Sequence, residues 1–177
     1  MARAKVERAI KEVLAHPNAA LRPLPVAEIA RQRGIEVVFD PLESAEDVSG
    51  FYFREGERRV IGVNSAHPSV RQRFTIAHEL GHALLHDNEG LHLDQAFKFR
   101  DRRSELAIDR EEIDANAFAA GVLMPEDDVW DAIDRFAIDF LDDRTMRAAA
   151  RHFGVSVQAL SYRLANLRAA IDGLAQI

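Results

Sequence analysis

The chain has 177 residues, of which 47% are hydrophobic, and this length and composition suit one domain with a small addition. It contains no cysteine, which excludes disulfides, thiolate metal ligands and cysteine nucleophiles. Its formal net charge of -6 argues against a free-standing nucleic-acid-binding protein, because such proteins are usually basic. The N-terminus does not resemble a signal peptide, and no stretch has the ~20 apolar residues that a membrane helix needs, so we expect a cytoplasmic protein with no membrane partner.

In chain order, the first half predicts two helices and a small sheet. Apolar residues at helical spacing cover residues 3–15 and 25–33, and Gly34 suits the end of the second helix. Three strand-like patterns follow, at residues 35–39, 50–54 and 58–63. The last two flank Gly56 and predict a hairpin. We expect the three strands to form a small antiparallel sheet.

The second half predicts helices joined by short connections. Helical patterns cover residues 70–86, 109–122, 144–152 and 157–170. The charged and weakly patterned residues 89–108 predict a loop or lid between the first two of these helices. A further helix is expected after Pro125, since proline fits a first turn and the acidic residues that follow it favour the positive end of the helix dipole. Ser156 is the expected N-cap of the last helix.

The helix predicted at residues 70–86 contains His78-Glu79-Leu80-Gly81-His82. Side chains four residues apart lie one turn apart on the same helix face, so His78 and His82 can bind one Zn²⁺ together. Glu79 projects beside them and can take a proton from a water molecule that the ion has made more acidic. The spacing therefore supplies two metal ligands and a general base.

The alternative is a helix whose two histidines are ordinary surface or core residues and bind no metal ion together. Its small and apolar neighbours argue against that alternative: Phe74, Ala77, Leu80, Gly81 and Leu84. They allow the helix to be buried, and unpaired polar groups are costly inside a protein. A bound metal ion would satisfy the two histidines, with zinc expected and manganese or another divalent ion acceptable to the same donors.

A catalytic zinc site usually has three protein ligands, so a third ligand is expected on a separate element. The candidates are Asp109, Glu111, Glu112, Asp114 and His86. Glu112 is favoured because it lies one turn before Asn116, whose side chain can accept the free ring N–H of a ligating histidine, His78 above all. Small and apolar residues on the same helix allow close packing against the first helix. The alternative for Glu112 is a solvated carboxylate at an acidic helix start.

Three other polar residues are candidates for contacts with the substrate or with an oxyanion: Tyr52, His86 and His92. His86 lies one turn after His82, but a histidine at that position more often closes the end of its own helix. Nothing in the sequence fixes the place of Tyr52 or His92.

Residues 147–164 have the sequence pattern of a helix-turn-helix, with small residues, a glycine turn and an N-capped second helix. Five arginines and no acidic residue lie between Arg144 and Ile171, a composition that suits direct contacts with DNA phosphates. The alternative, which we favour, is that these helices close the core or hold a protein partner. Their apolar residues would fill a core in either case.

Several segments together resemble the ImmA/IrrE family of metallopeptidases, over roughly residues 20–165. They are residues 35–39, 49–51 and 60–64 of the predicted sheet and residues 71–86 and 112–125 of the predicted helices. The resemblance implies a zincin-like fold with a gluzincin-like site. In such a site His78, His82 and Glu112 would be the ligands and Glu79 the base.

Members of that family are bacterial or phage cytoplasmic proteins. Several cleave a helix-turn-helix repressor encoded beside them and so switch on stress-response or mobile-element genes, and others are toxin–antitoxin components. The resemblance therefore implies a metallo-endopeptidase with a helix-turn-helix repressor as its substrate or antitoxin. One departure is Gly121-Val122-Leu123, where the family usually has a bulkier pair of leucines.

The predicted fold class is α+β. We expect a mostly helical, zincin-like minimal peptidase domain with a small antiparallel three-stranded sheet, followed by a helix-turn-helix-like helix pair. We place the peptidase domain at residues 1–135 and the C-terminal helices at residues 140–172, packed on it.

Overall fold

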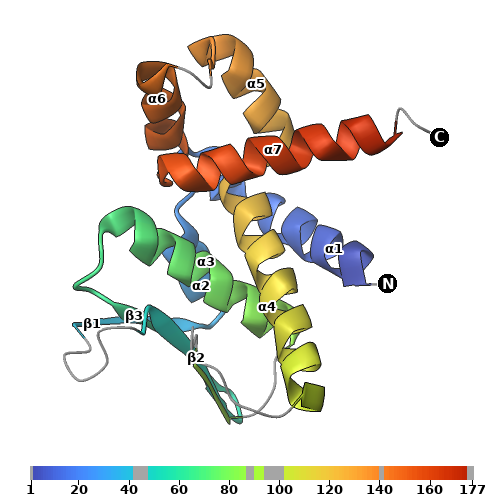
Figure 1. The fold of residues 1–177 in the computed structure, drawn as a ribbon. Helices are drawn as coiled ribbons and strands as arrows, with labels where there is room; N and C mark the ends of the chain where they lie inside the picture. Colours follow the sequence, from blue (N-terminus) through green and yellow to red (C-terminus); the bar gives the residue numbers. More distant parts are fainter. Residues whose placement is uncertain (1, 42–47, 87–89, 94–101, 140–141, 175–177) are drawn as a thin grey trace.

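Figure 1 shows the fold in a computed structural model, which describes residues 2–41, 48–86, 90–93, 102–139 and 142–174. The first half forms α1 (Ala2–Leu14), the 3-10 helix η1 (Pro17–Ala20), α2 (Val26–Gln32), β1 (Glu36–Asp40), β2 (Gly50–Glu55) and β3 (Arg58–Asn64). The second half forms α3 (Ser69–Leu85), β4 (Gly90–Leu93), α4 (Arg102–Leu123), α5 (Glu126–Phe136), α6 (Asp143–Phe153) and α7 (Val157–Leu174). The predicted α+β class is confirmed. Within the described residues, none of the helices combines the length and the apolarity needed to cross a membrane.

The sheet has the strand order β1-β3-β2-β4 and is mixed. β1 runs parallel to β3, while β2 pairs antiparallel with both β3 and β4. The expectation of an antiparallel three-stranded sheet is therefore wrong in strand number and in strand direction, although the hairpin across Gly56 is confirmed. β1 joins the outer edge of β3 instead of pairing with β2, its neighbour in sequence. β4 has four residues, which are too few for an alternating pattern to stand out.

The segment predicted as a loop or lid, residues 89–108, contains parts of two regular elements. β4 begins at Gly90, and α4 begins at Arg102 instead of near Asp109. The first turns of α4 are mostly charged in sequence, so no apolar periodicity marks them as helical. Residues 94–101 lie outside the described part of the chain.

α3 lies over the sheet. α4 crosses α3, and α1 packs against α4 (Figure 1). The interface between α1 and α4 explains the departure at Gly121. A Cβ at that position would lie 2.4 Å from Ile10 Cδ1, so the glycine lets α1 approach more closely than a bulkier residue would allow.

α5, α6 and α7 gather at the end of α4 that lies away from the sheet (Figure 1). The acidic residues after Pro125 lie in the first turn of α5, and Ser156 Oγ accepts a hydrogen bond from Ala159 N at 3.1 Å, as expected for an N-cap. Phe153 of α6 and Leu160 of α7 belong to the same cluster of buried apolar residues as α1 to α4. The C-terminal helices therefore share one continuous core with the rest of the chain.

Gly154 ends α6 with a φ of 66°, and a Cβ there would lie 2.7 Å from Arg73 Nε and 2.8 Å from Pro23 Cβ. We expect Gly154→Ala to lower the free energy of unfolding by ~2–4 kcal/mol, because a left-handed conformation costs an L-residue ~1–2 kcal/mol and the two contacts add strain. Urea unfolding measures the change. The control is Gly56→Ala, since Gly56 has a φ of 58° but no atom within 4 Å of its Cβ position. Equal losses in the two variants would contradict the role of close packing at Gly154.

Candidate metal centre

α3 and α4 cross with almost nothing between them at Gly81. A Cβ added to Gly81 would lie 3.0 Å from Phe118 Cδ1 and 3.1 Å from Ala115 Cα, so the two backbones come close at this point. The glycine of α3 and the alanine of α4 allow the approach because neither has a side chain long enough to separate the helices. Glu112 lies one turn before Ala115 and so comes near the residues that flank Gly81.

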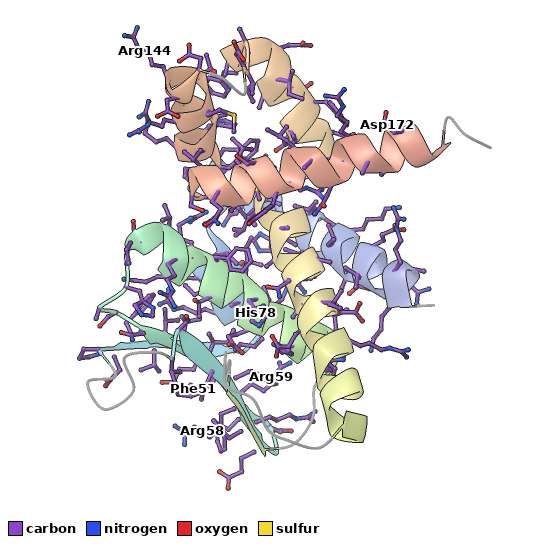
Figure 2. All side chains as sticks on the ribbon, in the orientation of Figure 1. Phe51, Arg58, Arg59, His78, Arg144 and Asp172 are labelled. Carbon is purple, nitrogen blue, oxygen red and sulfur yellow. The ribbon has the colours of Figure 1, made fainter. Side chains whose placement is uncertain are left out.

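Three side chains converge beside this crossing. His78 and His82 lie one turn apart on α3, and their Nε2 atoms are 3.1 Å apart. Glu112 reaches them from α4, with Oε2 3.2 Å from His78 Nε2 and Oε1 3.4 Å from His82 Nε2. Figure 2 shows His78 between α3 and α4. Each of the three residues therefore directs a ligand atom to one common region.

The separations between these atoms fit a single metal ion. Ligands that bind a tetrahedral zinc ion at ~2.0–2.1 Å lie ~3.3 Å from one another. The three shortest separations here are 3.1, 3.2 and 3.4 Å. Two imidazoles and a carboxylate are also a donor set that zinc and several other divalent ions accept, and three protein ligands leave one tetrahedral position open.

The centre is buried on the α3 side and open to solvent on the α4 side. His78, Glu79 and His82 are 3%, 0% and 1% exposed, whereas the Glu112 side chain is 28% exposed. Partial burial by itself raises the pKa of Glu112, but hydrogen bonds and charge interactions with His78 and His82 outweigh it and hold the pKa well below its ordinary value. Glu112 is therefore an anion at neutral pH, as a ligand for a cation must be.

Asn116 orients the ring of His78. Its Oδ1 lies 3.1 Å from His78 Nδ1, which donates its N–H to that oxygen. Because Nδ1 keeps its proton for Asn116, Nε2 is the ring nitrogen left to bind a cation, and it faces His82 and Glu112. The structure thus brings together His78 and Asn116, as the sequence suggested. Asn116 lies one turn after Glu112 on α4.

His86 lies next to this cluster, with its ring centroid 5.9 Å from that of His82. His86 is the C-cap residue of α3, as expected for a helix-end histidine, and its Nδ1 is 3.8 Å from Glu111 Oε1. Tyr52 is 2% exposed and belongs to the apolar core. His92 is opposite Tyr52 in the pairing of β2 with β4, and its side chain lies outside the described part of the structure. Among the described side chains, neither His86 nor Tyr52 belongs to the three-residue group that could hold a metal ion.

From the sequence, Gly81 is expected only to be a small residue that lets its helix be buried. The structure gives it a sharper role, because its lack of a side chain allows the close approach of α3 to α4 at this point. A signal for that role was available in Ala115, a second small residue one turn after Glu112.

Two histidines one turn apart, a glutamate between them and a carboxylate from a second helix form the arrangement that zinc metallopeptidases use. Residues 30–165 match the model of the peptidase family described as the IrrE N-terminal-like domain. The chain therefore belongs to this family, and the resemblance to the ImmA/IrrE family is confirmed.

Individual relatives agree with this assignment. The radiation response metalloproteases IrrE of Deinococcus radiodurans and Deinococcus deserti are 33% and 35% identical to the chain, over 74% and 75% of its length. The matches cover 37% and 43% of those relatives, so the chain spans less than half of their length. The uncharacterized immunity region protein 2 of Bacillus phage phi105 is 30% identical, over 56% of the chain and 58% of the phage protein.

A solved structure has the same fold. It is described as a Mycobacterium tuberculosis transcriptional regulator, and it superposes with a TM-score of 0.56 at 21% sequence identity. The superposition covers 92% of this chain and 46% of that one. At this identity the likeness shows the fold alone.

The hydrogen bond from His78 to Asn116 predicts a measurable effect on metal affinity. Asn116→Ala removes the acceptor that holds the His78 ring, and loss of such a partner typically weakens metal binding by ~10–100-fold. Competition for Zn²⁺ between the metal-free protein and a chromophoric chelator measures the affinity. Asn166→Ala, at an exposed position of α7, is the control and should bind as the unaltered protein does. Unchanged affinity in Asn116→Ala would show that the hydrogen bond does not orient a ligand.

Proposed function

We propose that the chain is a zinc-dependent metallo-endopeptidase in which His78, His82 and Glu112 hold the ion and Glu79 is the general base. The observation that carries this proposal is the convergence of three ligand atoms from two helices at separations of 3.1 to 3.4 Å. Membership of a peptidase family supports it. Manganese or another divalent ion would be acceptable to the same donors.

When bound, the ion supplies Lewis acidity, which polarises a peptide carbonyl and makes a nearby water molecule more acidic. Glu79 takes a proton from that water molecule as the water oxygen attacks the carbonyl carbon. It then returns the proton to the amide nitrogen as the C–N bond breaks, so that a carboxylic acid and an amine are released. Asn116 keeps His78 in the tautomer whose Nε2 has a lone pair for the cation.

The proposed substrate is a helix-turn-helix transcriptional repressor, whose cleavage would switch on stress-response or mobile-element genes in the bacterial cytoplasm. The family relation supports this choice, and so do the names of two relatives, a radiation response metalloprotease and a phage immunity region protein. The alternative is a toxin–antitoxin component that acts on such a partner by binding alone.

Direct DNA binding through the C-terminal helices is not favoured by the contacts of their arginines. Arg163 is half-buried and donates its Nε to the Met124 carbonyl at 3.0 Å, so part of its hydrogen-bonding capacity is used inside the protein. Arg147 and Arg168 each lie within reach of an acidic residue one turn away on their own helices. Three of the five arginines between Arg144 and Ile171 therefore contact a main-chain carbonyl or lie beside an acidic side chain.

The general base gives the sharpest test of the mechanism. Glu79→Gln keeps both histidines and should retain zinc, while cleavage of the repressor encoded by the neighbouring gene should fall by ~10²–10⁴-fold, because the proton acceptor is lost. Gel analysis of the purified repressor with each variant measures the rate. Cleavage at the normal rate would contradict the role of Glu79. Full biological activity in a variant that no longer cleaves would favour the binding-only alternative.

The third ligand has a test of its own. Glu112→Ala should lose most of its zinc during purification, because two imidazoles alone hold the ion weakly. Glu111→Ala is a matched control, since it removes the adjacent carboxylate of the same helix and should keep the metal content of the unaltered protein. Metal analysis of the purified proteins measures both. Equal zinc in the two variants would remove Glu112 from the ligand set.

A further inference from the structure

Two arginines join the helices of the metal centre to the C-terminal part of the chain. Arg73, on α3, donates Nε to the Gly154 carbonyl at 3.1 Å and Nη2 to the Leu24 carbonyl at 2.8 Å. Arg163, on α7, donates Nε to the Met124 carbonyl at the end of α4, at 3.0 Å. α3 is thereby fixed to the turn between α6 and α7, and α4 is fixed to α7 itself.

Neither arginine has the surroundings of an ordinary surface residue. Both are half-buried, and burial lowers the pKa of both guanidinium groups. All three of the hydrogen bonds described above end on main-chain carbonyls, so they depend on backbone positions and not on a mobile partner side chain. Arg163 also brings a cation to the C-terminal end of α4, where carbonyls lack partners within the helix.

Along each helix, the two contacts lie farther from the crossing of α3 and α4 than the proposed ligands His78 and Glu112 do. Met124 is ~14 Å beyond Ala115, and Arg73 is ~12 Å before Gly81, at a rise of ~1.5 Å per residue. The ligands Glu112 and His78 lie only ~4.5 Å from the same crossing residues. A tilt that moves a far end by ~1 Å would therefore move a ligand by about 0.3 Å, which exceeds the ~0.2 Å tolerance of metal–ligand distances.

We propose that Arg73 and Arg163 are positioning residues of the metal centre: they fix the angle between α3 and α4 at which His78, His82 and Glu112 meet. This role rests on the proposed metal site and deepens it. The α6–α7 pair then serves the peptidase by holding its two ligand-bearing helices, through contacts that can be tested one by one.

A purely stabilising role makes a different prediction. Loss of a stabilising contact lowers the Tm of the metal-free and metal-loaded proteins alike and leaves the metal affinity unchanged. Loss of a positioning contact weakens the metal affinity itself, so the rise in Tm on metal addition becomes smaller. Metal affinity and the metal-dependent rise in Tm therefore separate the two roles.

The test uses the full chain, stripped of metal and titrated with Zn²⁺ against a chromophoric chelator. Arg163→Gln should bind Zn²⁺ ~3–10-fold more weakly, a smaller effect than the ~10–100-fold expected for a direct partner of a ligand. The visible absorption spectrum of the Co²⁺ form should change with it, because that spectrum reports the ligand geometry. Arg168→Gln, an exposed position farther along the same helix, is the matched control and should behave as the unaltered protein does.

The α3 contact is tested in the same way. Arg73→Gln should weaken Zn²⁺ binding by a similar ~3–10-fold, because the same lever acts on His78. Its control is Arg71→Gln, two residues earlier on α3, where the exposed guanidinium donates to Ser49 Oγ. Arg163→Lys keeps a positive donor without the rigid fork of the guanidinium, and its affinity should fall between those of Arg163→Gln and the unaltered protein.

The outcomes separate the positioning role of the two arginines from the proposed function. If the unaltered chain binds Zn²⁺ and both glutamine variants bind it with the same affinity and the same Co²⁺ spectrum, the positioning role is wrong while the proposed function stands. If the unaltered chain binds no Zn²⁺, the proposed function fails and this inference fails with it. If circular dichroism shows that the glutamine variants do not fold, Arg163→Lys decides, since unchanged affinity in that variant would overturn the positioning role.

Discussion

The contact between Gly81 and Ala115 brings two helix backbones so close that a Cβ on Gly81 would lie 3.1 Å from Ala115 Cα. The candidate metal centre depends on this approach, because His78 and His82 lie on α3 and Glu112 on α4, and their side-chain atoms come within 3.1 to 3.4 Å of one another. The rest of the fold supports the crossing. The sheet lies under α3, α1 packs along α4, and Lys5 of α1 donates its Nζ to the Leu85 carbonyl at the end of α3.

A polar cluster in this position carries a free-energy cost that the surrounding contacts must offset. Two imidazoles and the Glu79 carboxylate are almost completely removed from water, and an unpartnered polar group in such a place would cost several kcal/mol, ~2–7 kcal/mol by transfer measurements. Asn116 satisfies one ring nitrogen of His78, and Glu112 sets a negative charge beside both Nε2 atoms. The arrangement therefore holds the ring nitrogens and carboxylate oxygens close together without an ion, so that binding of a cation would need little reorganisation.

The sequence predicted the limits of α3 and the N-cap of α7 well, because these depend on residues that are close together along the chain. The range expected for the ligand helix, 70–86, differs by one residue at each end from α3, because apolar periodicity and the preceding proline are local features. The Ser156 cap follows for the same reason. Sheet order could not be predicted in this way, since the parallel pairing of β1 with β3 is decided by a crossover and not by either strand's pattern.

The site shows the same division. His78 and His82 could be paired from their spacing alone, whereas Glu112 needed a second clue, its distance of one turn from Asn116. The sequence could not show which arginines are free to contact DNA and which are bonded inside the protein, because it gives their charge but not their neighbours. Arg163 was counted with the residues suited to DNA phosphates, and the structure places its Nε on the Met124 carbonyl instead.

The turn between α6 and α7 combines the features of a helix-turn-helix with a contact to α3. The turn at Gly154 has the left-handed conformation that the pattern predicts, and Ser156 caps the next helix, so the turn has the local features of a helix-turn-helix. Yet the carbonyl of Gly154 accepts a hydrogen bond from Arg73 of the ligand helix, and a side chain on Gly154 would collide with that arginine. The glycine therefore serves two needs at once, the backbone turn and the close approach of α3. In this protein the glycine turn of that pattern is bonded to α3, the helix that carries His78 and His82.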